Sequence, residues 1–187
     1  MTSRADTREP RSTGVMVWIA IVIAVFVDAA YLSLIASQGE PLPDALTVPF
    51  VAGYLALIAV LLWLSLREGP RWVKLRPPFR AAAAGGLLVF GVLELFSIGL
   101  PLVVAGALAT GAAVRALAGP RMKQALLLEV SAAVVALVVL VGGLEVTQRV
   151  IICPAHGSAG GSGSGLVTGA YEWQCTEGHL DYYRTPK

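Results

Sequence analysis

The sequence predicts an all-α integral membrane protein with five transmembrane helices, a cytoplasmic N-terminus and a small, disulfide-bonded tail on the outer side. Three observations lead to this prediction. Hydrophobic residues make up 56% of the chain and charged residues only 14%, which leaves no room for a large soluble domain. The hydrophobic residues are gathered in blocks long enough to cross a bilayer. Basic residues lie at alternate ends of these blocks, as the positive-inside rule requires.

The apolar blocks define five spans. A helix needs roughly 20 residues to cross a hydrocarbon core about 30 Å thick. Residues 81–114 form one block, which as a single helix would be about 51 Å long. That is too long for one span, and Gly99 and Pro101 near its midpoint indicate a turn. We therefore predict spans at 15–35, 48–66, 81–98, 100–118 and 125–146.

Eleven of the fourteen Lys and Arg residues lie in three clusters, which set the orientation of the spans. With five spans all three clusters face the cytoplasm, whereas four spans would place the last cluster outside. Residues 1–14 are then a cytoplasmic segment, 15–146 the membrane domain and 147–187 an extracytoplasmic tail. A cleaved signal peptide is the alternative for the first span, but a signal h-region is only about 7 to 15 residues long. The clusters are Arg4, Arg8 and Arg11; Arg67, Arg71, Lys74, Arg76 and Arg80; and Arg115, Arg121 and Lys123.

The second basic cluster, in residues 67–80, also contains Trp72 and Phe79. Such a mixture is expected at the level of the lipid headgroups, where it binds anionic lipid, although orientation alone would explain the charge. Nothing in it indicates a nucleic-acid site. The whole chain is rich in Ala, Val, Gly and Arg, which is typical of GC-rich bacterial genomes. We therefore predict a multi-pass protein of the bacterial cytoplasmic membrane.

Both cysteines and both histidines of the chain lie in the tail. Two cysteines on the oxidising side of a membrane favour a disulfide between Cys153 and Cys175, which would stabilise the tail by roughly 3 kcal/mol. The alternative is a zinc site in which His156 and His179 join the two thiolates, the set of ligands that tetrahedral Zn²⁺ prefers. Free or intermolecular thiols are the third possibility. We favour the disulfide and predict no cofactor.

The tail also contains a strand-like pattern. Tyr171, Trp173 and Cys175 alternate with polar residues, which predicts a strand, and residues 150–153 are its expected partner in a short β-hairpin. Residues 157–165 are nearly all Gly, Ser and Ala, so we expect a mobile loop there. An isolated hairpin is marginal in water. It is therefore expected either to cover the helix ends or to dock on a partner protein.

Four carboxylates fall inside the predicted spans: Asp28, Glu94, Glu129 and Glu145. A charged side chain at the bilayer centre costs about 2.5 to 3.5 kcal/mol on insertion scales, so such residues usually face the bundle interior. Asp28 and Glu94 each lie about 20 Å into a span that runs outward, so they are expected at one level. Two interpretations stay open for this pair, interhelical hydrogen bonding and the transport of a proton or cation.

The other two carboxylates lie nearer the membrane surfaces. Glu145 has Arg149 one helical turn further along, which favours an ordinary ion pair. Glu129 is expected about two turns into the last helix, near the inner surface. In the fourth span, Ala105 and Ala109 belong to a row of small residues that allows close helix packing, either within this chain or against another subunit.

The sequence contains no motif that carries a known chemistry. A phosphate-binding G-x-x-x-x-G-K-[ST], a zinc-binding H-E-x-x-H, a G-x-S-x-G and an internal repeat are all missing. Our first hypothesis is therefore a non-catalytic accessory or structural subunit of a larger membrane assembly, with a membrane protein or further copies of itself as partners. The second is a small oligomeric transporter or channel that uses Asp28 and Glu94. An intramembrane enzyme is the third and least favoured.

Overall fold

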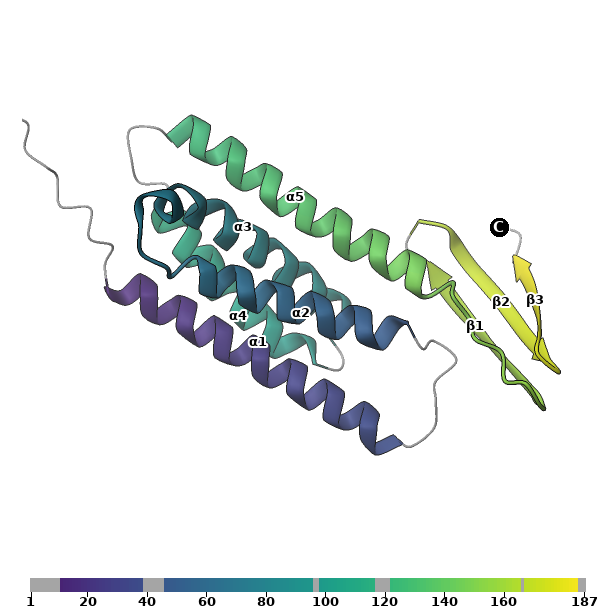
Figure 1. The fold of residues 1–187 in the computed structure, drawn as a ribbon. Coiled ribbons are helices and arrows are strands. Elements are labelled where there is room, and N and C mark those ends of the chain that lie inside the picture. Colours follow the sequence, from purple (N-terminus) through teal and green to yellow (C-terminus); the bar gives the residue numbers. More distant parts are fainter. Residues whose placement is uncertain (1–10, 39–45, 96–97, 117–121, 166, 185–187) are drawn as a thin grey trace, which may run out of the picture. The chain divides into compact units, whose positions relative to one another are not determined.

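The computed structural model describes residues 11–38, 46–95, 98–116, 122–165 and 167–184. In these residues five helices are followed by an antiparallel sheet of three strands (Figure 1). The described residues divide into two compact units, one within Met1–Ala30 and Leu55–Leu137 and the other within Tyr31–Tyr54 and Val138–Lys187. The elements are α1 (Arg11–Gln38), α2 (Thr47–Leu64), α3 (Pro70–Leu93), α4 (Gly99–Ala116), α5 (Met122–Thr147), β1 (Ser158–Gly165), β2 (Gly169–Thr176) and β3 (His179–Arg184).

Among the described helices, three are long and apolar enough to cross a membrane. They cover Arg11–Ser37, Thr47–Leu64 and Leu126–Thr147, with 27, 18 and 22 residues. These helices contain most of the first, second and fifth predicted spans, and their length and apolar composition suggest a membrane protein. The remaining apolar helix, Gly99–Arg115, is shorter. Five crossings and their orientation therefore stay predictions.

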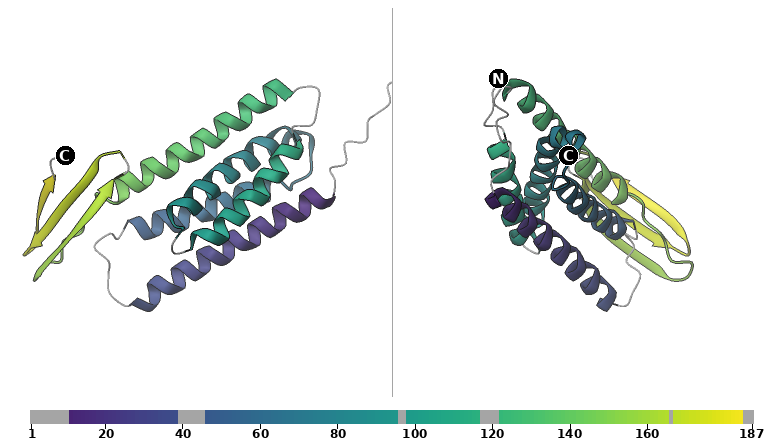
Figure 2. Two further views of the ribbon diagram at one scale, coloured as in Figure 1. Left: turned by 180° about the vertical axis from the view of Figure 1, so that it is seen from behind. Right: turned by 60° about the vertical axis from the view of Figure 1, so that its left-hand side comes forward.

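The first unit contains a tight hairpin of α3 and α4, which lie side by side in both views of Figure 2. Helix α3 ends at Leu93 rather than near residue 98, because the chain turns where Gly99 N–H donates to Glu94 O over 2.8 Å. The expected turn is thus present but begins several residues early. Helix α3 also starts at Pro70, so much of the basic segment that we expected at the headgroups is helical.

Glycines allow α3 and α4 to approach closely. A Cβ atom on Gly91 would lie 2.8 Å from Val103 N and 2.9 Å from Gly99 O, and one on Gly106 would lie 2.8 Å from the Leu88 Cγ. The alanine row of α4 is buried in the same unit, with Ala105 and Ala109 fully covered. Ala105 and Ala109 of the fourth predicted span therefore pack within this chain.

The second unit contains the sheet, whose strand order is β1-β2-β3. Strand β2 pairs with β1 from Gly169↔Gly165 to Thr176↔Ser158, and with β3 from Tyr171↔Arg184 to Thr176↔His179. Two expectations for this region are wrong. Residues 157–165 are not a loop, because β1 occupies nearly all of them, and residues 150–153 are not the paired strand. They instead contribute Ile151 and Cys153, which pack against the sheet's small core.

The glycines of β1, which have no side chains, explain why this segment pairs with β2. A Cβ atom on Gly161 would lie 2.8 Å from Trp173 Cζ2, and one on Gly163 would collide with the Tyr171 ring. The aromatic rings of β2 therefore cover the bare backbone of β1 and bury apolar area that β1 itself cannot supply. A segment of Gly and Ser has no strand-like pattern of its own, and it becomes a strand because its neighbour has large rings.

Candidate functional site

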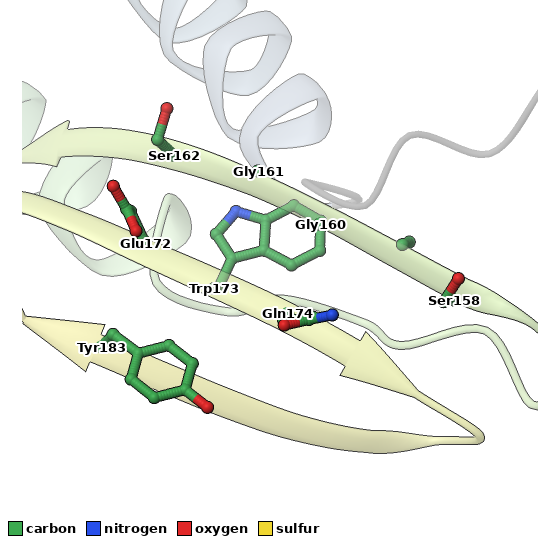
Figure 3. A pocket seen from close by; sticks show the side chains of 9 residues that line it. Ser158, Gly160, Gly161, Ser162, Glu172, Trp173, Gln174 and Tyr183 are labelled. Atoms are coloured by element: carbon green, nitrogen blue, oxygen red, sulfur yellow. The ribbon is translucent and has the colours of Figure 1, made fainter.

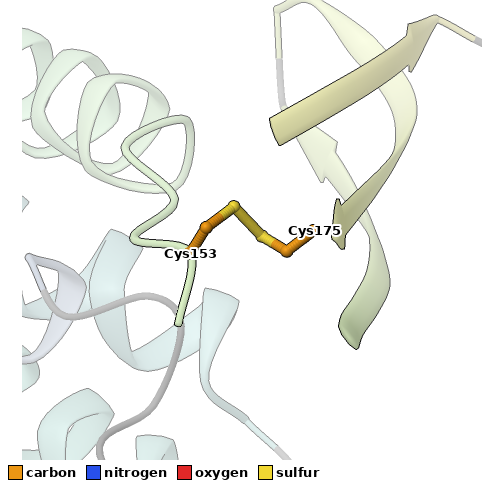
Figure 4. Close-up of a disulfide and its surroundings, with 2 residues drawn as sticks. All are labelled: Cys153 and Cys175. Atoms are coloured by element: carbon orange, nitrogen blue, oxygen red, sulfur yellow. A yellow bond between two sulfur atoms is a disulfide. The ribbon is translucent and has the colours of Figure 1, made fainter. Parts of the chain in front are cut away.

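The disulfide fixes the start of the tail to the middle strand of the sheet (Figure 4). Cys153 and Cys175 are 22 positions apart, and their Cα atoms are 5.5 Å apart. Cys175 is fully buried beside Tyr171 and Trp173. The predicted disulfide is confirmed. Because it uses both sulfur atoms, the thiolates of the alternative zinc site with His156 and His179 are not available in this form.

Glu145 connects the last turn of α5 to the turn between β1 and β2. Its carboxylate accepts a hydrogen bond from Arg149 Nη2 over 3.2 Å, the ion pair expected from their spacing. It also accepts hydrogen bonds from the Val167 N–H over 3.3 Å and from the Thr168 hydroxyl. Gly165 leaves room for this carboxylate, since a Cβ atom there would collide with it.

A second contact holds the same end of the sheet. The Tyr171 hydroxyl donates a hydrogen bond of 2.8 Å to the carbonyl oxygen of Gln148, just after α5 ends. Together with Glu145, this bond attaches the sheet to the end of α5 at two points. Sequence reasoning missed both contacts, because the partners are 22 or 23 positions apart and meet only once β1 and β2 have formed.

One face of the sheet carries an open pocket of about 490 Å³ (Figure 3). Strand pairing places its side chains in rows that cross the sheet. Ser162, Glu172 and Tyr183 form one row, while Gly160 and Gln174 belong to the next. Gly160, which has no side chain, lies in the lining of this pocket. The hydroxyl, amide, carboxylate and phenol groups of the pocket are suited to hydrogen bonding with a polar ligand.

The carboxylates within the helices occupy different environments. Asp28 is half-buried in α1, and its Oδ1 has no hydrogen-bond partner in the described part of the chain. Glu129 in α5 is only 6% exposed, and its Oε1 likewise lacks a partner there. Glu94 is half-buried, and as the C-cap of α3 it lies at the end of the helix and not in its middle. Within the residues that the structure describes, Asp28 Oδ1 therefore forms no hydrogen bond with the Glu94 carboxyl group.

The basic segment has structural contacts that the sequence did not reveal. Arg76 Nη2 donates to the Arg67 carbonyl over 2.8 Å, and Arg80 Nε donates to the Ser65 hydroxyl over 3.3 Å. Arg80 is 1% exposed, although we expected it in a cytoplasmic segment at the level of the lipid headgroups. The Arg67 guanidinium also lies 4.3 Å from the centre of the Trp63 ring, within cation–π range. Several of these positive charges therefore hold the end of α2 to α3.

The described residues are mostly helical, with three helices long and apolar enough to cross a membrane, and they include a small disulfide-bonded sheet. Within the described residues, no group of three or more His, Cys, Asp or Glu side chains is placed to hold a metal ion. Comparison with protein-family models, with curated proteins and with solved structures finds no match for this chain. Its function must therefore be inferred from its own residues.

Proposed function

We propose that this chain is a non-catalytic accessory subunit of a larger membrane assembly in the bacterial cytoplasmic membrane. Its helices anchor it through five crossings with the N-terminus inside, and its sheet is presented on the outer side. The observation that carries this proposal is the double attachment of the sheet to α5 through Glu145 and Tyr171. A sheet fixed in this way to a membrane helix is held ready to contact another protein.

The character of the pocket supports binding as its role. Ser158, Ser162, Glu172, Gln174 and Tyr183 offer donors and acceptors on neighbouring strands. A general base would need to be within hydrogen-bond reach of a nucleophile, and polar groups spread along an open face are better suited to recognition. Ala105 and Ala109 of α4 are already packed inside the chain, whereas the sheet exposes an open polar face to a partner.

The proposed orientation is open to a labelling test. Single cysteines introduced near Asp44 and Gly160 should react with a membrane-impermeant maleimide in intact cells, and cysteines near Lys74 and Arg121 should react only after lysis. Asp44 and Arg121 lie outside the described residues, so their side of the membrane rests on charge alone. The native cysteines form a disulfide and do not compete for the reagent. Labelling of the Lys74 site in intact cells would show that the orientation is the opposite of the one proposed.

A transporter or channel is the second candidate, and Asp28 is the observation that favours it. Met16 of α1 lies beside Gly111 of α4, and Ser12 contacts Arg115, so the two helices run antiparallel. Asp28 is about 18 Å beyond Met16, which places it near the level of the turn after Glu94. A carboxyl oxygen without a hydrogen-bond partner inside a membrane helix is costly, and a proton or cation would relieve that cost.

Isolation of the tagged protein from its native membrane separates the two candidates. In mild detergent, we expect a discrete set of partner proteins in stoichiometric amount. The paired variant Asp28→Asn with Glu94→Gln keeps shape and removes charge, so an accessory subunit should recover the same partners at levels within about twofold. Recovery of a homo-oligomer alone, together with a proton or cation flux in vesicles that the paired variant abolishes, would instead establish transport.

A further inference from the structure

The outer edge of β1 is an unprotected strand edge. In the described part of the chain β1 pairs with β2 on one side only, over eight consecutive positions without a bulge. Exposed edges present unpaired N–H and C=O groups, and proteins usually protect them with charged residues, proline, bulges or short strands. Ser158–Gly165 has none of these features. At the opposite edge, β3 is shorter and contains His179, Asp181 and Arg184.

We propose that the outer edge of β1 binds an extended segment of a partner protein, and that this segment carries a Lys or Arg side chain that crosses Gly160 to reach Glu172. The added strand would pair with β1 through backbone hydrogen bonds, and the basic side chain would provide specificity. This inference rests on the proposed function, because it identifies the surface through which an accessory subunit contacts its assembly.

Gly160 provides the gap that such a side chain needs. A Cβ atom at Gly160 would lie 3.4 Å from Trp173 O, an ordinary contact, so the fold itself does not require glycine here. The neighbouring Gly161 is different, since its Cβ would come within 2.8 Å of the Trp173 ring on the other face of the sheet. Gly161 thus leaves room for the Trp173 ring in the core of the sheet. Gly160 leaves a gap in the exposed face beside the outer edge of β1 (Figure 3).

The charge of this face selects the partner. Strand alternation places Glu172 and Asp181 on the same face as Gly160, and none of the sheet positions on that face is Lys or Arg. A strand added outside β1 would lie two strand spacings, roughly 10 Å, from β2, where Glu172 is the diagonal neighbour of Gly160, two residues from Gln174. Among common side chains, Lys and Arg have the length to extend over Gly160 and donate a charge-assisted hydrogen bond. A second copy of β1 contains no basic residue, so self-pairing would leave Glu172 without a counter-charge.

The test uses the full chain in lipid nanodiscs and two synthetic eight-residue peptides. Both peptides alternate Thr and Val, and they differ only in a central Lys or Glu. Binding is measured by fluorescence anisotropy of labelled peptide, and the site is located by amide hydrogen exchange. We expect the Lys peptide to slow exchange at Ser158–Gly165. The Gly160→Val variant should bind the Lys peptide about tenfold or more weakly, because the new side chain fills the gap. Unchanged exchange in β2 and β3 would show that this variant is folded.

Glu172→Gln gives a second, independent measurement. An exposed ion pair is worth about 0.2 to 1 kcal/mol, so this variant should bind the Lys peptide about 1.5- to 5-fold more weakly and lose its preference over the Glu peptide. Equal affinity of the unmodified protein for both peptides would overturn the proposal, as would β1 amides that exchange at the same rate with and without peptide. Protection of the β1 amides that appears without peptide and rises with protein concentration would overturn the proposal and indicate that two copies of β1 pair with each other.

The two proposals can fail separately. If the native assembly is recovered with Gly160→Val as with the unmodified protein, the chain remains an accessory subunit but does not contact its partner through the β1 edge. If the Lys peptide protects β1 and no assembly is recovered from native membranes, the edge is a peptide site and the accessory role is wrong.

Discussion

Replacement of both Cys153 and Cys175 with serine is expected to unfold the three-stranded sheet and leave the helices intact. The disulfide closes a loop between residues 22 positions apart, and in the chain-entropy model it contributes about 3 kcal/mol. The described core of the sheet has only three buried residues, Tyr171, Trp173 and Cys175. Three strands on so small a core have little stability of their own. The serine at position 175 would also be fully buried, which adds about 1 to 3 kcal/mol if its hydroxyl finds no partner.

Amide hydrogen exchange followed by mass spectrometry measures this effect in detergent. Peptides that cover Ser158–Thr176 should exchange at rates close to those of an unfolded chain, while peptides from α1 and α5 should not change. A paired alanine variant is the matched control, because it removes the disulfide without burying a hydroxyl. It should unfold the sheet less completely than the serine pair. Full protection of the sheet in both variants would show that the aromatic contacts with β1 suffice and that the disulfide is dispensable.

The sequence predicts the three long apolar helices well, because a long apolar run is a direct physical requirement for crossing a bilayer. It locates the ends of the third helix poorly. Pro77 and Pro78 lie inside α3, although proline normally argues for a helix end. The basic residues around them led us to expect a surface segment. In the structure, Arg80 instead contacts Ser65, at the end of a helix fifteen positions earlier in the chain. A contact of that kind depends on how two helices pack, which no local pattern contains.

In the tail, too, local patterns predict some contacts but not those that depend on packing between distant residues. Counting cysteines predicts the disulfide, and the spacing of Glu145 and Arg149 predicts their ion pair. The strand of Gly and Ser was missed, since glycine has neither a side-chain pattern nor an intrinsic preference for strands. Its conformation is set by Trp173 and Tyr171, whose rings need a bare backbone beside them. The candidate binding surface was missed for the same reason, because it consists of the edge and the exposed face of that strand.

Replacement of Gly91 with valine is expected to disrupt the α3–α4 hairpin. The new Cβ atom would lie 2.8 Å from Val103 N and 2.9 Å from Gly99 O. Both are backbone atoms, so they cannot move aside as the end of a side chain can, and the two helices must separate. Overpacking in a tight core typically costs 1 to 3 kcal/mol, and contact with backbone on the partner helix places this substitution at the upper end, about 3 kcal/mol.

Gly53→Val in α2 is the matched control for Gly91→Val. A Cβ atom on Gly53 would meet nothing within 4 Å, and this glycine is exposed in the structure. Both substitutions change the intrinsic helix preference equally, so the difference between them isolates the packing term. Thermal unfolding in detergent, followed by circular dichroism, should show a clear loss of Tm for Gly91→Val and almost none for Gly53→Val. Equal losses would mean that helix preference dominates. In that case the close approach of α3 and α4 would contribute little to the stability of the protein.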